Sequence, residues 1–230
     1  MPRKFLPASI AALIVAACAQ EVSVHVRGGD RPPNPNFLML DTGVDVDEFQ
    51  IVLRNLRLQA YPTDGGVDLE GVAHIGPEAY LVDLPASSLT GGVFTPLLSE
   101  QGLGAKGFYE MDIDLAPVSD ADVQTKPGLA PLLGKTFVIK GRNQQGVPFT
   151  FESSMRQVLV RPSVYRMGLN NNNLDVNIAP NTWFQNPDGG TPIDPATIDP
   201  ALRAIIESNV AASIDAYEDD NMDGIPDPLG

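Results

Sequence analysis

The 230-residue chain is poor in the residues that build covalent and metal-bound cores: it has one cysteine and two histidines. A single cysteine, Cys18, excludes an internal disulfide, so packing or a bound ion must hold the fold. The histidines, His25 and His74, are too few and too poorly flanked to predict a zinc site. Beyond the N-terminal residues, no apolar run is long enough to span a bilayer.

Positive charge is scarce too, with 15 Lys and Arg residues against 29 Asp and Glu, a net charge of −14. The imbalance is steepest from Asp175 onward, where eleven acids face one base, Arg203. Nucleic acids and anionic lipid headgroups are themselves negative, so this composition argues against electrostatic binding to either.

The first 18 residues have the layout of a secretory signal peptide: "MPRK", then the apolar "FLPASIAALIVAA". The residues Val15–Cys18, "VAAC", resemble the bacterial lipobox, whose cysteine receives lipid. That resemblance implies a signal peptide over 1–17 and an anchor and linker over 18–36, with the membrane as partner through lipid on Cys18. In the lipoproteins that this segment resembles, Ala19 in place of Asp would favour the outer membrane or cell surface. An ordinary signal peptide, cleaved before Gln20 with loss of the cysteine, is the alternative.

Short alternating segments separated by Gly, Pro and Asn predict a mainly β protein. We expect an antiparallel β-sandwich, or a partly open barrel, over residues 37–180. A slip in the apolar pattern of 47–60 predicts a bulged strand, 135–154 predicts a hairpin, and the run Asn170–Asn173 predicts a turn. In the strand over 107–117, Glu110, Asp112 and Asp114 occupy one face.

Residues 181–230 are expected to form a linker, a helix and an acidic tail. Asp199 is a sound N-cap, Pro200 suits the first helical position, and apolar residues recur at helical spacing as far as Tyr217.

Two glycine-rich stretches imitate nucleotide-binding motifs. Gly102–Gly107 matches G-x-G-x-x-G but precedes a predicted strand where the dinucleotide fingerprint needs a helix. Gly128–Thr136 resembles a P-loop but has one residue too many between its glycines and a proline inside. We therefore expect no nucleotide and no nucleic acid as partner.

Other side chains suggest chemistry less directly. Asp112 and Asp114 are candidates for paired catalytic carboxylates, although alternating acids usually form the solvated face of a strand. Trp183, Phe184 and Tyr165 are candidates for a sugar-stacking platform, although a lone tryptophan more often anchors a core.

The best-spaced ligand set is "DDNMDGIPD", residues 219–227. Counting Asp219 as position 1 gives D-x-N-x-D-G, the first half of a calcium loop, which Gly224 allows to turn sharply. Asp219, Asn221, Asp223 and Asp227 offer side-chain oxygens, and Ile225 offers its backbone carbonyl. Position 12 is Gly230, so the usual bidentate glutamate is missing. The loop resembles those of thrombospondin type 3 repeats, dockerin-like segments and EF-hands, and predicts a weak structural calcium site. A solvated acidic tail is the alternative.

The phrases "YLVDL" and "GFYEMDIDL" are similar to segments of uncharacterised bacterial surface lipoproteins, over about residues 48–178. The resemblance implies a β-sandwich and transfers no catalytic residue. We expect an exported, lipid-anchored, non-enzymatic binding or structural module, with a surface protein or polysaccharide as partner. An exported carboxylate-dependent hydrolase and a structural subunit of an envelope complex are the alternatives.

Overall fold

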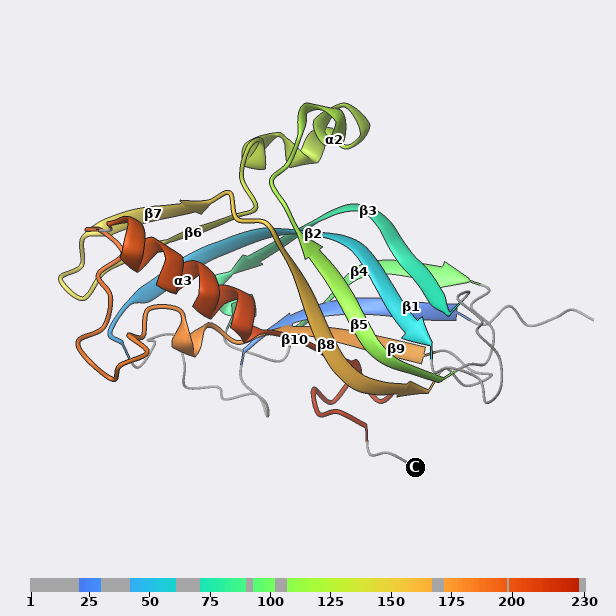
Figure 1. Ribbon diagram of the computed structural model, residues 1–230. Coiled ribbons are helices and arrows are strands. Elements are labelled where there is room, and N and C mark those ends of the chain that lie inside the picture. The colour runs from blue at the N-terminus through green and yellow to red at the C-terminus, as the bar shows by residue number, and fades with distance from the viewer. Residues whose placement is uncertain are drawn as a thin grey trace, which may run out of the picture.

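The computed structural model describes residues 21–29, 42–60, 71–89, 93–101, 107–166, 172–197 and 199–227. Within these ranges the chain forms two β-sheets (Figure 1), which confirms the mainly β class and the sandwich architecture; the sheets do not close into a barrel. Sheet A has the order β10-β9-β1-β4, from the strands β1 (Glu21–Gly28), β4 (Phe94–Gln101), β9 (Asn172–Ile178) and β10 (Ile214–Glu218).

Sheet B is built around the 16-residue strand β2 (Asp45–Ala60). One edge of β2 pairs with β3 (Val72–Pro85), and the other edge pairs first with β6 and then with β5. The remaining strands follow outward, in the order β7-β6-β2-β5-β8: β5 (Gly107–Leu115), β6 (Phe137–Arg142), β7 (Pro148–Ser153) and β8 (Gln157–Arg166). The predicted hairpin of β6 and β7 is confirmed.

Two strands of sheet A lie outside the range predicted for the sandwich, 37–180. β1 lies between β4 and β9, and β10 pairs with the other edge of β9. β1 and β9 pair in parallel, whereas the other seven strand pairs of the described residues are antiparallel. Because β9 begins at Asn172, the prediction of a turn through Asn173 is wrong for its second half; Asn170 and Asn171 lie outside the described residues.

The predicted bulge in β2 is confirmed at Asn55. The pairing with β3 shifts register on either side of Leu56, and Asn55 has a left-handed backbone with φ 46°. Asparagine tolerates this conformation better than most residues, so the slip in the apolar pattern marked a real irregularity. The bulge keeps Leu53 and Leu56 both buried.

The inner face of sheet B is covered by sheet A along one half and by the C-terminal helix along the other. That helix is α3 (Pro200–Ser213), preceded by the short 3₁₀ turn η2 (Pro180–Thr182). The Trp183 ring lies 4.5 Å from the ring of Phe49, centroid to centroid, and Trp183 is fully buried. Phe184 and Tyr165 are fully buried as well. These three aromatic residues are core anchors, and none is exposed as a sugar-stacking platform.

The predicted helix begins as expected and ends early. Asp199 caps it by accepting a hydrogen bond from the Leu202 N–H at 2.8 Å. Beyond Ser213 the chain turns into β10, so Ile214 and Tyr217 are strand residues and the helical spacing there is coincidental. At this point the backbone pairing with β9 outweighs local helix propensity. At the helix end, Arg161 of β8 donates to the carbonyls of Ala211 and Ile214.

A separate small segment covers part of the outer face of sheet B. It contains α2 (Asp120–Thr125) and the 3₁₀ helix η1 (Pro127–Leu132), and Figure 1 shows it projecting from the sandwich on the side away from the C-terminus. Its apolar side chains pack with those of the sheet in a second buried cluster of Val52, Ala79, Val118, Leu129, Leu132 and Val138. The P-loop-like stretch Gly128–Thr136 lies mostly in η1. It does not connect a strand to a following helix, as a P-loop does. The remaining short helix, α1 (Ala86–Leu89), follows β3.

Candidate calcium loop

The C-terminal loop, residues 219–227, folds back against the outer face of sheet A instead of extending into solvent. Asp219 donates its N–H to the carbonyl of Asn173 at 2.9 Å, and the Asn173 N–H donates to the Asp220 carboxylate at 2.9 Å. The Asn173 side chain also donates to the Asp220 carbonyl at 3.1 Å. Asn173, the second residue of β9, therefore holds the beginning of the C-terminal loop.

A second attachment comes from a buried arginine. Alternation along β1, β9 and β10 places Arg27, Asp175 and Tyr217 on the outer face of sheet A, where each would ordinarily be solvated. The Arg27 guanidinium donates to the carbonyl of Gly224 at 3.1 Å, and all three side chains are at most 2% exposed. The C-terminal loop thus seals a polar cluster against the sheet.

The members of this cluster bind one another. Arg27 Nε lies 3.4 Å from the Asp175 carboxylate, and Arg27 Nη2 donates to the Tyr217 hydroxyl at 3.1 Å. The Tyr217 hydroxyl donates to Asp175 at 2.6 Å. A buried arginine is tolerated only when paired and hydrogen-bonded, so these contacts are needed for the loop to cover it. We refer to Arg27, Asp175 and Tyr217 as the Arg27 cluster.

Gly224 lies directly against the guanidinium. Its φ is +80°, a region that favours glycine, and a Cβ built on it would lie 2.4 Å from Arg27 Nη1. Glycine is therefore required here for two reasons: the turn of the loop and the closeness of its backbone to Arg27.

Within the C-terminal loop the predicted ligand side chains accept hydrogen bonds from backbone N–H groups of the same loop. The Asp219 carboxylate accepts from the N–H groups of Asp223 and Gly224, at 3.1 and 2.8 Å. The Asp223 carboxylate accepts from the Ile225 N–H at 2.8 Å, and that of Asp227 accepts from the Asp220 N–H at 2.6 Å. Asn221 accepts from the Asp223 N–H at 3.0 Å.

The donor chemistry fits a hard cation, but the arrangement is not a closed coordination shell. Five oxygen donors within nine residues are the ligand type that calcium prefers. Among the residues that the structure describes, however, no three or more His, Cys, Asp or Glu side chains are grouped so as to hold a metal ion. The carboxylates of Asp219, Asp223 and Asp227 are directed at backbone N–H groups rather than at one shared point.

The electrostatics of Asp219 favour a cation nearby. Burial raises the pKa of its carboxyl, and the negative charges of Asp223 and Asp227 raise it further, against the lowering effect of the two N–H donors. Asp219 is 1% exposed, so a negative charge there lacks the solvation that water would give. A bound cation would relieve both the burial and the repulsion.

The other candidate acids lie on the outer face of sheet B and are held by neighbouring side chains. Arg57 Nη2 lies 2.7 Å from Asp114 Oδ1 and 3.5 Å from Asp112 Oδ2. Asn55 donates to Asp114 at 2.7 Å, and Gln59 donates to Asp112 at 3.0 Å. Both carboxylates therefore belong to a cross-strand network with Arg57, and neither lines the two cavities described below.

The two histidines, His25 and His74, lie on different sheets. His25 lies on β1, where burial lowers the pKa of its imidazole and the Asp219 charge opposes that effect. His74 lies on β3 of the other sheet. Cys18, the predicted lipidation site, lies outside the described residues. In the part of the chain that the structure describes, no helix combines the length and apolar character that crossing a membrane requires.

Two cavities of similar size are lined by described residues. The first, of about 250 Å³, is lined by Thr42, Gln185, Asn186, Gly189, Gly190 and Pro192. The second, of about 230 Å³, lies between β3, β4 and η1, where the Lys126 ammonium is 4.2 Å from the centroid of the Tyr80 ring and 2.6 Å from Glu78. Lys126 is thus already neutralised by a protein carboxylate.

Comparison with protein-family models, with curated proteins and with solved structures finds no significant match for the chain. The resemblance to bacterial surface lipoproteins therefore stays a prediction, and the functional argument depends on the residues themselves.

Sequence reasoning found the acids of the C-terminal loop and missed the residues beneath it. Arg27 ends a strand pattern, "VSVHVR", and 148 positions separate it from Asp175. The one available signal was the alternation itself, which puts His25 and Arg27 on the face opposite the valines. Nothing in the sequence indicated that the chain terminus would cover that face.

Proposed function

We propose that the protein is an exported, lipid-anchored, non-enzymatic module of the bacterial cell surface, of the surface-lipoprotein type. In this proposal Cys18 carries the lipid, and calcium is a structural ion of the C-terminal loop. The observation that supports it best is the packing of that loop: an acidic segment with calcium-loop spacing lies on the sandwich, with Asp219 buried.

Calcium would act on the arrangement already described. Bound at Asp219, Asn221, Asp223, Asp227 and the Ile225 carbonyl, it would neutralise the repelling carboxylates and stabilise the loop over the Arg27 cluster. A single loop without a bidentate ligand at position 12 should bind weakly, with a dissociation constant of about 10⁻⁴–10⁻³ M, as in extracellular modules. Such an affinity suits a structural ion in a calcium-rich exterior.

The non-enzymatic part of the proposal is supported by the state of the candidate carboxylates. A catalytic pair needs one oxygen free to meet substrate in a cleft. Asp114 is bonded through both oxygens, to Arg57 and to Asn55. Asp112 accepts from Gln59 through Oδ2, and its unpartnered Oδ1 is shielded from solvent. These contacts suit a cross-strand network that stabilises sheet B.

The calcium proposal is tested by isothermal titration of millimolar calcium chloride into wild type, Asp223→Ala and Asp120→Ala. Asp120 is an exposed acid in the first turn of α2, so its variant loses the same charge at a distant site. We expect saturable heat for wild type and Asp120→Ala and none for Asp223→Ala. Equal heats for all three proteins would show general charge screening and refute the site.

The anchor is tested by intact-mass measurement of the protein purified from its native membrane. Retention of Cys18 with a mass increase equal to a diacylglycerol and an amide-linked acyl chain is expected. A chain that begins at Gln20, or an unmodified Cys18, would refute lipid anchoring and leave the calcium proposal untouched.

A further inference from the structure

Strand β1 begins very close to the predicted lipidation site. Its first residue is Glu21, which lies inside the range 18–36 that the sequence predicts as anchor and linker. Ala19 and Gln20 alone therefore separate Cys18 from a strand of sheet A. A chain spans at most about 3.6 Å per residue, so the steps from Cys18 to Glu21 cover about 11 Å or less, whatever path they take.

The start of β1 is a fixed point of the fold. The strand is paired on both sides, with β4 from Glu21 onward and with β9 from Val22 onward. Val22 and Val24 are 0% exposed. Releasing the first residues of β1 would break two ladders and expose buried valines, whereas an edge strand would break one ladder. The connection to Cys18 therefore cannot lengthen at the expense of β1.

Strands of both sheets begin or end level with Glu21 (Figure 1). Glu21 is paired with Gln101, the last residue of β4, and β9 begins beside it at Asn172. The Tyr165 hydroxyl of β8 donates to the Ala216 carbonyl of β10 at 3.0 Å, which joins the two sheets near the last residues of both strands. We refer to this end of the sandwich, at Glu21, Gln101, Asn172 and Tyr165, as the β1 end.

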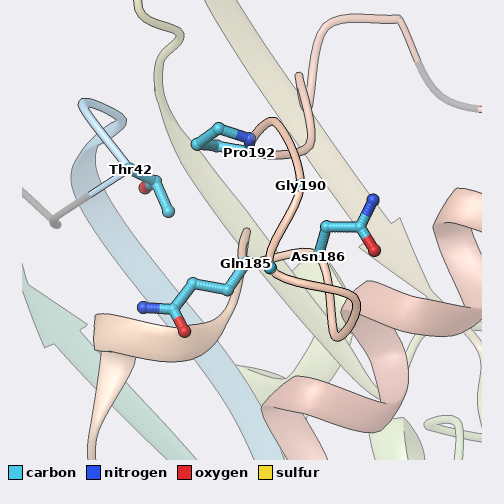
Figure 2. A pocket seen from close by; sticks show the side chains of 6 residues that line it. Thr42, Gln185, Asn186, Gly190 and Pro192 are labelled. Atoms are coloured by element: carbon cyan, nitrogen blue, oxygen red, sulfur yellow. The ribbon is translucent and has the colours of Figure 1, made fainter.

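The opposite end of the sandwich is far from Glu21. The 16-residue strand β2 begins there, and at about 3.3 Å per residue its contour is about 50 Å long. The turn between β6 and β7, residues 143–147, lies at this end (Figure 1). So does the cavity between Thr42 and the loop of residues 185–192, shown in Figure 2, because Gln144 of the turn donates to the Thr42 carbonyl.

The β1 end carries negative charge. Glu100 and Asp220 are exposed there, and Glu21 accepts a hydrogen bond from the Ser99 hydroxyl. Anionic lipid headgroups would repel these carboxylates, so this end suits a surface of zwitterionic headgroups. The short covalent connection, and not charge attraction, is what can hold this end near a membrane.

We propose that the β1 end faces the lipid bilayer and is held close to its headgroups by the short connection to acylated Cys18. The opposite end, with the β6–β7 turn and the loop of residues 185–192, then faces away from the membrane and is the first part that a soluble partner meets. This gives a lipid-facing surface and an orientation to the proposed function, and it depends on the lipid anchor of that proposal.

The test is fluorescence quenching of the acylated full chain in phosphatidylcholine vesicles that contain a lipid with a nitroxide on its headgroup. Because Cys18 is the single cysteine and acylation blocks its thiol, one introduced cysteine can be labelled alone. Ser99→Cys labels the β1 end and Gln145→Cys labels the β6–β7 turn; both positions are exposed. We expect quenching at least about threefold stronger at Ser99→Cys, since the nitroxide acts only at short range and β2 alone spans about 50 Å.

A longer connection tests whether the short one causes this orientation. Inserting about 16 Gly and Ser residues between Gln20 and Glu21 adds about 20 Å of root-mean-square reach and changes neither the lipid nor the charge. The quenching of Ser99→Cys should then fall at least about twofold, while that of Gln145→Cys stays low. The urea midpoint should stay the same, because the insertion precedes the first strand.

The proposed orientation is overturned if Cys18 is acylated by intact mass and the two labels are quenched equally. It is equally overturned if the longer connection leaves the quenching of Ser99→Cys unchanged. Both results would leave lipid anchoring itself intact. An unmodified Cys18 would overturn the anchor and the orientation together, so the mass measurement distinguishes the two failures.

Discussion

The outer faces of the two sheets carry similar charged residues in opposite environments. On sheet A, Arg27 and Asp175 have side chains 0% and 2% exposed beneath the C-terminal loop. On sheet B, Arg57 and Asp114 have side chains 21% and 22% exposed, in a shorter ion pair of 2.7 Å. Distance alone would rank the second pair as the stronger. Burial reverses their importance, because a charge shielded from water depends on its partner far more.

The two faces are also covered in different ways. The α2 and η1 segment covers part of sheet B with apolar side chains, whereas the C-terminal loop covers sheet A with backbone and carboxylates. An apolar cover needs no specific partner, but a polar cover depends on each hydrogen bond. We therefore expect the C-terminal loop to be the part of the molecule that ions, acid and substitution affect most.

The largest expected effect is the difference in stability loss between replacing Arg27 and replacing Arg57. Arg27→Met leaves Asp175 buried beside a neutral side chain and should lower the free energy of unfolding by about 3–5 kcal/mol. Arg57→Met, the matched change on the partly exposed face, should lower it by about 1 kcal/mol or less. Urea denaturation followed by circular dichroism measures both. Equal losses would show that the C-terminal loop does not shield Arg27.

The next effect concerns the glycine that touches Arg27. Gly224→Ala should lower the free energy of unfolding by about 2–4 kcal/mol, from the left-handed backbone and from the clash with the guanidinium. Gly146→Ala is the control: it has a similar φ, +76°, and nothing within 4 Å of the new Cβ. It should lose only about 1–2 kcal/mol. If the two variants unfold at the same urea concentration, the close packing of the loop on Arg27 is wrong.

A smaller effect is expected where the α2 segment is joined to sheet B. Asp122 accepts two hydrogen bonds from Arg54, at 2.6 and 2.8 Å, and completes the capping box with Ser119. Asp122→Ala should lower the free energy of unfolding by about 1–2 kcal/mol.

The contribution of Asp122 should depend on pH. Bonding to Arg54 holds the pKa of Asp122 well below its usual range. The folded state then binds fewer protons than the unfolded state, so this stability is present above the unfolded pKa, near 3.8, and is lost as the pH falls toward the folded value. The difference in the free energy of unfolding between wild type and Asp122→Ala, measured from neutral pH downward, should shrink below pH 4. A constant difference would contradict the ion pair.

The smallest effect should have the opposite sign. Burial raises the pKa of Asp219 above its usual 3.8, so without calcium the folded state binds more protons than the unfolded state. Stability from this group should therefore fall as the pH rises through the window that begins near 3.8. Asp219→Asn should remove this fall in stability with rising pH. Calcium should reduce the fall, because it favours the ionised carboxylate. A slope in the other direction would contradict a buried, uncompensated Asp219.

The sequence was most informative where a pattern is local. Period-two alternation predicted β2, β5 and the β6–β7 hairpin of sheet B, the Asp199–Pro200 pair predicted the helix start, and the slip near Asn55 predicted the bulge. Local spacing also predicted the oxygen donors of a calcium site from Asp219 to Asp227, and that site stays a prediction. Each of these signals lies within about ten residues, and no distant segment is needed to interpret it.

Features that depend on distant segments were not predictable. Ile214 and Tyr217 fit a helical period, yet pairing with β9 makes them strand residues. Asp112 and Asp114 were expected on a solvated face, whereas cross-strand contact with Arg57 makes Asp112 only 9% exposed. The Arg27 cluster joins three strands and the chain terminus. Sequence spacing carries no information about such contacts, because the topology of sheet A alone brings them together.

The central claim is that the acidic C-terminal segment is a packed layer of the domain and not a solvated tail. Hydrogen exchange at the Gly224 amide tests it most directly, since that N–H is bonded to the buried Asp219 carboxylate at 2.8 Å. We predict exchange at least about 100-fold slower than in an unfolded chain, slower still with millimolar calcium, and fast in Arg27→Met. Exchange of Gly224 at the unfolded rate in wild type, with and without calcium, would contradict the account.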